Sequence, residues 1–173
     1  DNCPNIDNPG QEDIDGDGLG DVCDDDPGCP DTNTDLSPTV TALPNTITGA
    51  STVNVVIDIS EVGGADSEGL ITVRIPVDAK MTFIYDNTLT NIGFFQLDNA
   101  DWTYKGTGTG LFHTFESTTV IPSTGSSSFG IIAQYDPGST EGQTTLSPSI
   151  MFGSGSECNF NNNFDVESVI YFD

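Results

Sequence analysis

The first 35 residues of the chain are so acidic that they cannot fold around a hydrophobic core. They carry twelve carboxylates and no Lys or Arg, since the first basic residue of the chain is Arg74. With few apolar side chains to bury, the segment cannot offset the entropy lost on ordering its backbone, so it is either disordered or folded by something else. The carboxylates belong to Asp1, Asp7, Glu12, Asp13, Asp15, Asp17, Asp21, Asp24, Asp25, Asp26, Asp31 and Asp35.

The whole chain shares this bias, with 3 Lys and Arg against 27 Asp and Glu and a formal net charge of −24. Binding to nucleic acid or to an anionic membrane surface requires clustered basic side chains, so neither partner is expected. No apolar run approaches the ~20 residues of a membrane span, and membrane insertion is not expected either. Oxygen-rich side chains instead favour hard cations such as calcium.

The string DIDGDGLGDVCD, residues 13–24, has the ligand spacing of a calcium loop. Such loops present oxygen ligands at positions 1, 3, 5, 7, 9 and 12, with Gly at position 6 for a sharp turn. Carboxylates on alternate residues of a tightly turning backbone converge, and a divalent cation relieves their repulsion. The positions are filled by Asp13, Asp15, Asp17, Gly18, the Leu19 carbonyl, Asp21 and Asp24.

The flanks of this loop do not suit the helices of an EF-hand, because Pro breaks helices. The wider string DNCPNIDNPGQEDIDGDGLGDVCDDD, residues 1–26, closely resembles a thrombospondin type 3 repeat. The resemblance implies an aperiodic chain wrapped around calcium ions, often two with shared ligands, and a disulfide between Cys3 and Cys23. It is carried by Asp1-Asn2-Cys3-Pro4, Asn8, Gln11, the Asp13/Asp15/Asp17-Gly18 run and Gly20-Asp21-x-Cys23-Asp24.

A second calcium loop can be counted from Asp24, which would then serve both ions. Asp26 falls at position 3, the Pro30 carbonyl at position 7 and Asp35 at position 12. Gly28 at position 5 offers no side chain, so a second ion at these residues remains open.

Beyond a linker at 31–38, the apolar residues recur with the period of two that is typical of strands. We expect about nine short strands and no helix of useful length, which predicts an all-β, antiparallel immunoglobulin-like sandwich over residues 36–173 behind a spacer at 1–35. One inward face consists of Val53, Val55, Ile57 and Ile59, and the other of Ile71, Val73, Ile75 and Val77. The predicted core combines five of these residues with Ile131: Val53, Val55, Ile57, Val73, Ile75 and Ile131. The remaining strands are expected near 39–43, 81–86, 101–105, 110–116, 127–136, 144–151 and 166–173.

This second part resembles the immunoglobulin-like repeats of large bacterial surface and secreted proteins. The features that carry the resemblance are DWTYKGTGTGLFHTF (101–115), IPSTGSSSFGIIAQYDP (121–137) and CNFNNNFDVESVIYF (158–172). It implies a stalk, an adhesin segment or an accessory module of a secreted enzyme, within a longer protein.

The four cysteines indicate disulfides and an oxidising, extracellular compartment. If Cys3 and Cys23 are paired as the first resemblance implies, Cys29 would join Cys158 and fix the acidic segment to the sandwich. The alternative is a local Cys23–Cys29 bridge, which would leave Cys3 for a distant partner.

Other candidate groups have a structural and a functional interpretation. The single histidine, His113, is expected to be a packed or surface residue, because no nucleophile-elbow string accompanies it. Trp102 and Tyr104 share one face of a strand, where they are either core residues or a platform for stacking sugars. The Asn run at 159–163 is expected to occupy left-handed turn positions, with calcium binding through amide oxygens as the alternative.

These observations favour a non-enzymatic, calcium-stabilised adhesion or stalk module of an extracellular protein. Its expected partners are calcium, surface glycans and neighbouring modules of the same protein. The alternative is a carbohydrate-binding accessory module of a secreted polysaccharide-degrading protein, for which an exposed Trp102–Tyr104 pair would be the evidence.

Overall fold

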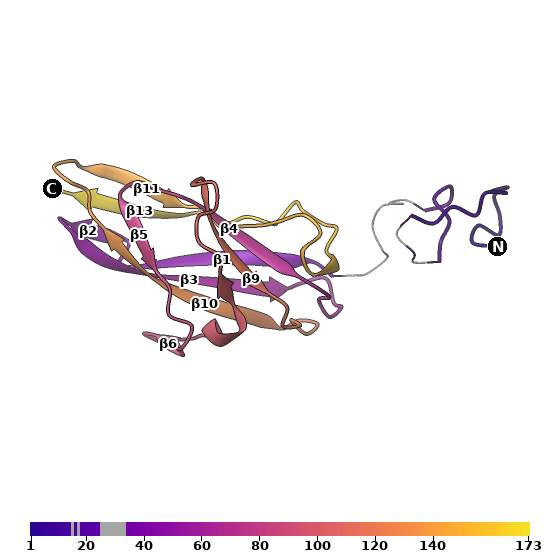
Figure 1. Ribbon diagram of the computed structural model, residues 1–173, viewed down its shortest axis with the longest axis horizontal. Helices are drawn as coiled ribbons and strands as arrows, with labels where there is room; N and C mark the ends of the chain where they lie inside the picture. The colour runs from indigo at the N-terminus through magenta and orange to yellow at the C-terminus, as the bar shows by residue number, and fades with distance from the viewer. Residues whose placement is uncertain (15, 17, 25–33) are drawn as a thin grey trace.

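The computed structural model describes residues 1–14, 16, 18–24 and 34–173 (Figure 1). Over residues 36–172 the chain folds into the predicted all-β, immunoglobulin-like sandwich. Its elements are β1 (Leu36–Leu43), β2 (Thr46–Thr48), β3 (Ser51–Glu61), β4 (Ile71–Pro76), β5 (Met81–Ile84), β6 (Asn91–Ile92), β7 (Phe95–Gln96), η1 (Asn99–Asp101), β8 (Thr103–Tyr104), β9 (Phe112–Ser117), β10 (Ser126–Tyr135), β11 (Gly142–Leu146), β12 (Ser149–Ile150), η2 (Ser154–Ser156) and β13 (Glu167–Phe172). No helix in this described part of the chain is long and apolar enough to cross a membrane.

Three sheets surround one hydrophobic core. They have the strand orders β1-β3-β10-β5, β12-β4-β9-β8 and β11-β13-β2, and β6 and β7 form a separate hairpin. Residues from all three sheets meet in the same buried cluster. The predicted core is confirmed: all six of its residues are fully buried, and Val55 lies directly opposite Ile131 where β3 pairs with β10. Period-two patterning therefore places the inward faces correctly.

The described residues form thirteen strands rather than about nine, and the structure differs from the expectation in four further respects. Val77 is 38% exposed rather than buried, because β4 ends at Pro76, and alternation of faces stops with the strand. The linker predicted at 31–38 extends too far, because β1 already begins at Leu36 and residues 36–38 belong to the sandwich. The strand expected at 144–151 is two strands, β11 and β12, separated by residues 147–148. The sandwich is not wholly antiparallel either, because β13 pairs with β2 in parallel.

A second, smaller apolar cluster lies on the outer face of β3 and β10, which the alternating pattern assigns to solvent. Val56 is only 3% exposed there, because Ile92 of β6 and Leu97 pack over it. A Cβ added to Gly130 of β10 would lie 2.6 Å from both Ile92 and Leu97, so the hairpin segment needs a glycine beneath it. The side chain of Asn99 holds this segment in place, donating to the carbonyl of Gly130 and accepting from its amide.

Candidate metal centre

The N-terminal segment is closed by the predicted disulfide between Cys3 and Cys23, whose Cα atoms are 5.8 Å apart. This pairing excludes the alternative bridge between Cys23 and Cys29. Cys3 is 1% exposed, although the segment around it is almost entirely polar. A Cβ at Gly20 would lie 2.7 Å from the Cys3 sulfur and 2.5 Å from Asn2 Oδ1, so only glycine lets the chain pass this close.

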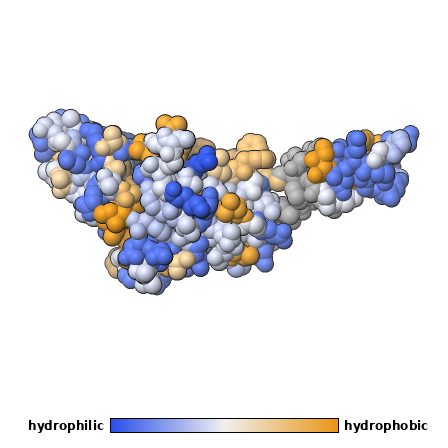
Figure 2. All heavy atoms as spheres, in the orientation of Figure 1, coloured by the Kyte–Doolittle hydropathy of each residue, from blue (hydrophilic) through white to orange (hydrophobic). Residues whose placement is uncertain are grey.

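Hydrogen-bonded amides, not apolar side chains, pack around the disulfide. Asn8 Nδ2 donates to Asn2 Oδ1 over 2.7 Å, and the backbone N–H of Asn2 donates to Gln11 Oε1 over 3.1 Å. Gln11 Nε2 donates in turn to the Asn8 carbonyl over 2.9 Å, and Gly20 N–H donates to the Asn2 carbonyl over 2.9 Å. Figure 2 shows that the visible face of this segment is mostly hydrophilic. Asn2, Asn8, Gln11 and Gly20 therefore have a structural role, which is to pack and hydrogen-bond around the disulfide.

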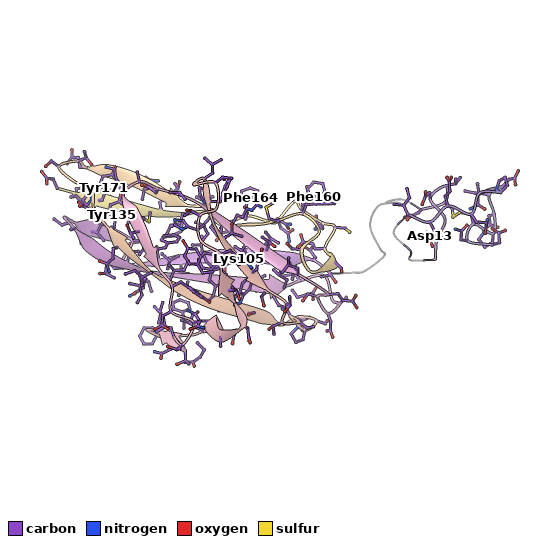
Figure 3. All side chains as sticks on the ribbon, viewed as in Figure 1. Asp13, Lys105, Tyr135, Phe160, Phe164 and Tyr171 are labelled. Atoms are coloured by element: carbon purple, nitrogen blue, oxygen red, sulfur yellow. A yellow bond between two sulfur atoms is a disulfide. The ribbon has the colours of Figure 1, made fainter. Side chains whose placement is uncertain are left out.

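Two carboxylates of the predicted ligand set, at positions 1 and 9 of the loop, accept hydrogen bonds from the backbone; the first, Asp13, is labelled in Figure 3. Asp13 accepts hydrogen bonds from the amides of Gly16 and Gly18, at 2.8 and 3.1 Å. Asp21 accepts from the Ile14 amide at 2.9 Å. Gly18, at position 6, has a φ of +96°, a left-handed conformation that favours glycine.

The central part of the predicted ligand set lies outside the described residues. Asp15 and Asp17 of the first loop and Asp26 of the second loop lie there. Cys29, the predicted partner of Cys158, also lies outside the described residues. Among the described residues, no three His, Cys, Asp or Glu side chains are grouped closely enough to hold a metal ion. Calcium binding at residues 13–24 and the Cys29–Cys158 bridge accordingly stay predictions.

Asp35, the last predicted ligand of the second loop, contacts the sandwich. Its two carboxylate oxygens accept hydrogen bonds from Asn159 Nδ2 at 2.9 Å and Asn162 Nδ2 at 2.8 Å. The Asn run 159–163 contains a turn at residues 161–162, as expected, but the expected left-handed conformation is wrong, because none of these residues has a positive φ. Their side chains instead bind the residue that precedes β1.

Glu61, at the end of β3, is a buried carboxylate that the sequence analysis did not single out. It is 2% exposed and accepts hydrogen bonds from the backbone amides of Asp35, Gly63, Gly64 and Thr124 at 2.8–3.2 Å. Burial alone would raise the pKa of Glu61, but these donors favour the charged form and bring the pKa below its ordinary value. Its inward parity with the other buried β3 residues was the available signal.

Replacing Glu61 with Gln is expected to destabilise the sandwich by ~1.5–3 kcal/mol near neutral pH, because charge-assisted hydrogen bonds are stronger than neutral ones. A carboxyl with a depressed folded pKa contributes stability above its unfolded pKa of 4.5 and loses it as the pH falls through the lower folded value. Urea unfolding at neutral pH and below pH 4.5 should show the difference from the wild type shrinking in acid. The exposed Glu68→Gln is the control, and an equal effect of the two variants would contradict this role for Glu61.

Trp102 and Tyr104 do not form an exposed aromatic platform. Trp102 is 2% exposed, its indole N–H donates to Ser127 Oγ at 3.0 Å, and its ring lies 4.6 Å from that of Phe129. The Tyr104 ring is partly buried and stacks on Phe115 at 4.8 Å. The core interpretation is confirmed, and the sugar-stacking interpretation is wrong because both rings face inward.

His113 is a packed residue, as expected. It is 5% exposed, stacks on Phe83 with ring centroids 4.1 Å apart, and its Nδ1 lies 2.7 Å from the Tyr104 hydroxyl. Burial lowers the pKa of His113, which keeps the ring neutral at physiological pH. The absence of enzymatic activity remains an expectation.

No family model matches the sequence. In fold, the chain is similar to the cohesin module of a family 33 glycoside hydrolase from Clostridium perfringens, with 13% identity, a TM-score of 0.54 and coverage of 80% of this chain and 98% of that module. It is also similar to the major pilin SpaD from Corynebacterium diphtheriae, with 12% identity, a TM-score of 0.50 and coverage of 79% of this chain and 33% of the pilin. At such identities the likeness concerns the fold of the sandwich alone.

Proposed function

We propose that this chain is a calcium-stabilised extracellular adhesion or stalk module of a larger surface or secreted protein. In this proposal, calcium ions hold residues 1–35 as a rigid spacer, and the sandwich is the unit that the spacer displays. The observation that carries it is the way in which the described residues of segment 1–24 hold together without a hydrophobic core. A disulfide joins Cys3 to Cys23, an amide network surrounds it, and Asp13 and Asp21, two carboxylates with calcium-loop spacing, accept backbone hydrogen bonds.

Two further observations support the proposal. A net charge of −24 suits a chain whose main small partners are cations, and a disulfide suits an oxidising compartment. The sandwich shares its fold with one module of a glycoside hydrolase and with part of a pilin. The carbohydrate-binding alternative loses its main support, since Trp102 is buried.

Removal of calcium is expected to expose residues 1–24 to proteolysis while leaving the sandwich intact. Trypsin cannot report on this segment, because the first basic residue is Arg74, so a protease that cleaves after Asp and Glu is required. With calcium, cleavage within residues 1–24 should slow at least ~10-fold relative to cleavage in EGTA, as expected when a ligand binds only the folded form.

A matched pair of variants makes this experiment specific. Asp13→Asn should abolish the protection by calcium, whereas Asp7→Asn, which changes an exposed carboxylate outside the loop, should retain it. Equal cleavage rates of the wild type with calcium and with EGTA would overturn the proposed role of calcium.

A further inference from the structure

The loop between η2 and β13 contains a second buried carboxylate, Glu157. It is 2% exposed, and neither of its oxygens makes a hydrogen bond of normal geometry with any described residue. The Leu36 amide and the Asn163 side chain lie beside it. Burial, aided by the charge of Asp35, raises the pKa of Glu157 to about 7 against the lowering effect of these two neighbours. Glu157 thus contrasts with Glu61, whose two carboxylate oxygens both accept hydrogen bonds from backbone amides.

Two amide oxygens of the same loop share this condition. Asn162 Oδ1 and Asn163 Oδ1 are both buried and without a hydrogen-bond partner among the described residues. Asn162 cannot exchange its amide oxygen and nitrogen without breaking the bond from its Nδ2 to Asp35. The Asn163 backbone is fixed as well, because its carbonyl accepts from the Ile150 amide of β12 at 2.8 Å.

These groups make up a set of buried oxygen acceptors that outnumbers the donors beside it, the Leu36 amide and the Asn163 side chain. A buried acceptor left unpaired is unfavourable, and this loop contains four: two from Glu157 and one each from Asn162 and Asn163. A proton on Glu157 would satisfy at most two of them, the protonated oxygen and the acceptor to which it donates, and would leave two unpaired. No Lys or Arg is among the groups that act on Glu157, and the one ion pair in the described part of the chain joins Lys105 and Glu116 elsewhere.

We propose that Glu157, Asn162 and Asn163 bind a calcium ion where the Asn-rich loop meets the start of β1, with the carboxylate of Asp35 adding negative charge beside it. Carboxylate and amide oxygens without nitrogen or sulfur ligands are the donor set of a hard cation, and calcium accepts the irregular geometry of a loop. This site belongs to the sandwich and shares no residue with the loop at 13–24. The inference therefore does not rest on the proposed function.

The experiment measures thermal unfolding of the full chain carrying Asp13→Asn, Asp15→Asn and Asp17→Asn, which disable the first loop. The fluorescence of Trp102, the single tryptophan and a core residue, reports on the sandwich. Saturating calcium is expected to raise the Tm by at least ~5 °C relative to EGTA. Adding Glu157→Gln should remove this shift, whereas the exposed Glu141→Gln should leave it unchanged.

A second variant keeps the test valid if Glu157→Gln does not fold. Asn163→Ala removes one neutral ligand and should raise the calcium concentration needed for half of the Tm shift by at least ~10-fold. The site is disproved if calcium does not shift the Tm of the triple variant, or if the shift persists unchanged with Glu157→Gln. Neither result bears on the loop at 13–24, which the proteolysis experiment tests in the wild type.

Discussion

Replacing Val55 with Asp is expected to prevent the sandwich from folding. Val55 is fully buried in the middle of β3, paired with Ala42 of β1 on one side and Ile131 of β10 on the other. A carboxylate there would lose its hydration without gaining a partner, and the packing of the valine methyl groups would be lost too. The combined penalty of ~5 kcal/mol or more is comparable to the whole stability of a domain.

Thr52→Asp provides the matched control for this substitution. Thr52 lies on the same strand but is exposed, so the same new charge remains in water and should change stability by less than ~0.5 kcal/mol. Circular dichroism and Trp102 fluorescence during urea unfolding measure both variants. A folded Val55→Asp chain with a normal unfolding transition would show that the core assignment is wrong.

The double substitution Cys3→Ser with Cys23→Ser is expected to unfold residues 1–24 and leave the sandwich folded. The disulfide closes a loop with a sequence separation of 20. In the chain-entropy model, such a bridge contributes ~3 kcal/mol. The segment lacks a hydrophobic core that could compensate, so this loss should outweigh the amide network of Asn2, Asn8 and Gln11.

Proteolysis after Asp and Glu, with calcium present, measures the effect. The double variant should be cleaved within residues 1–24 at the rate that the wild type shows in EGTA. Val22→Ser is the control, since Val22 is 59% exposed and lies next to the disulfide without forming it. Full protection of the double variant by calcium would contradict a stabilising role for the bridge.

The inward faces of the long strands were predictable, because alternation depends only on local geometry. Val53 to Ile59 and Ile71 to Ile75 follow the rule, and it stops at Val77, where the strand ends. The burial of Val56 was not predictable in this way. It depends on the β6–β7 hairpin, whose contacts with the outer face of β3 and β10 are tertiary.

The polar sites show the same distinction between features encoded locally and features that depend on tertiary packing. The spacing at residues 13–24 and the Cys3–Cys23 pairing are encoded within one short segment, and the structure bears out the pairing. Glu157 has no local signal, whereas Asn163 belongs to the Asn run for which calcium binding through amide oxygens was the alternative interpretation; the burial of both depends on contacts with other elements. Trp102 shows that period two assigns residues to a common face without saying whether that face is inside or outside.

Calorimetric titration of the full chain with calcium tests the central claim most directly. The wild type should bind calcium with a Kd at or below ~10⁻³ M, the range of extracellular modules. The variant with Asp13→Asn, Asp15→Asn and Asp17→Asn should bind at least one ion fewer per chain. An absence of binding heat in the wild type, or an identical stoichiometry in the two proteins, would contradict the calcium loop at residues 13–24.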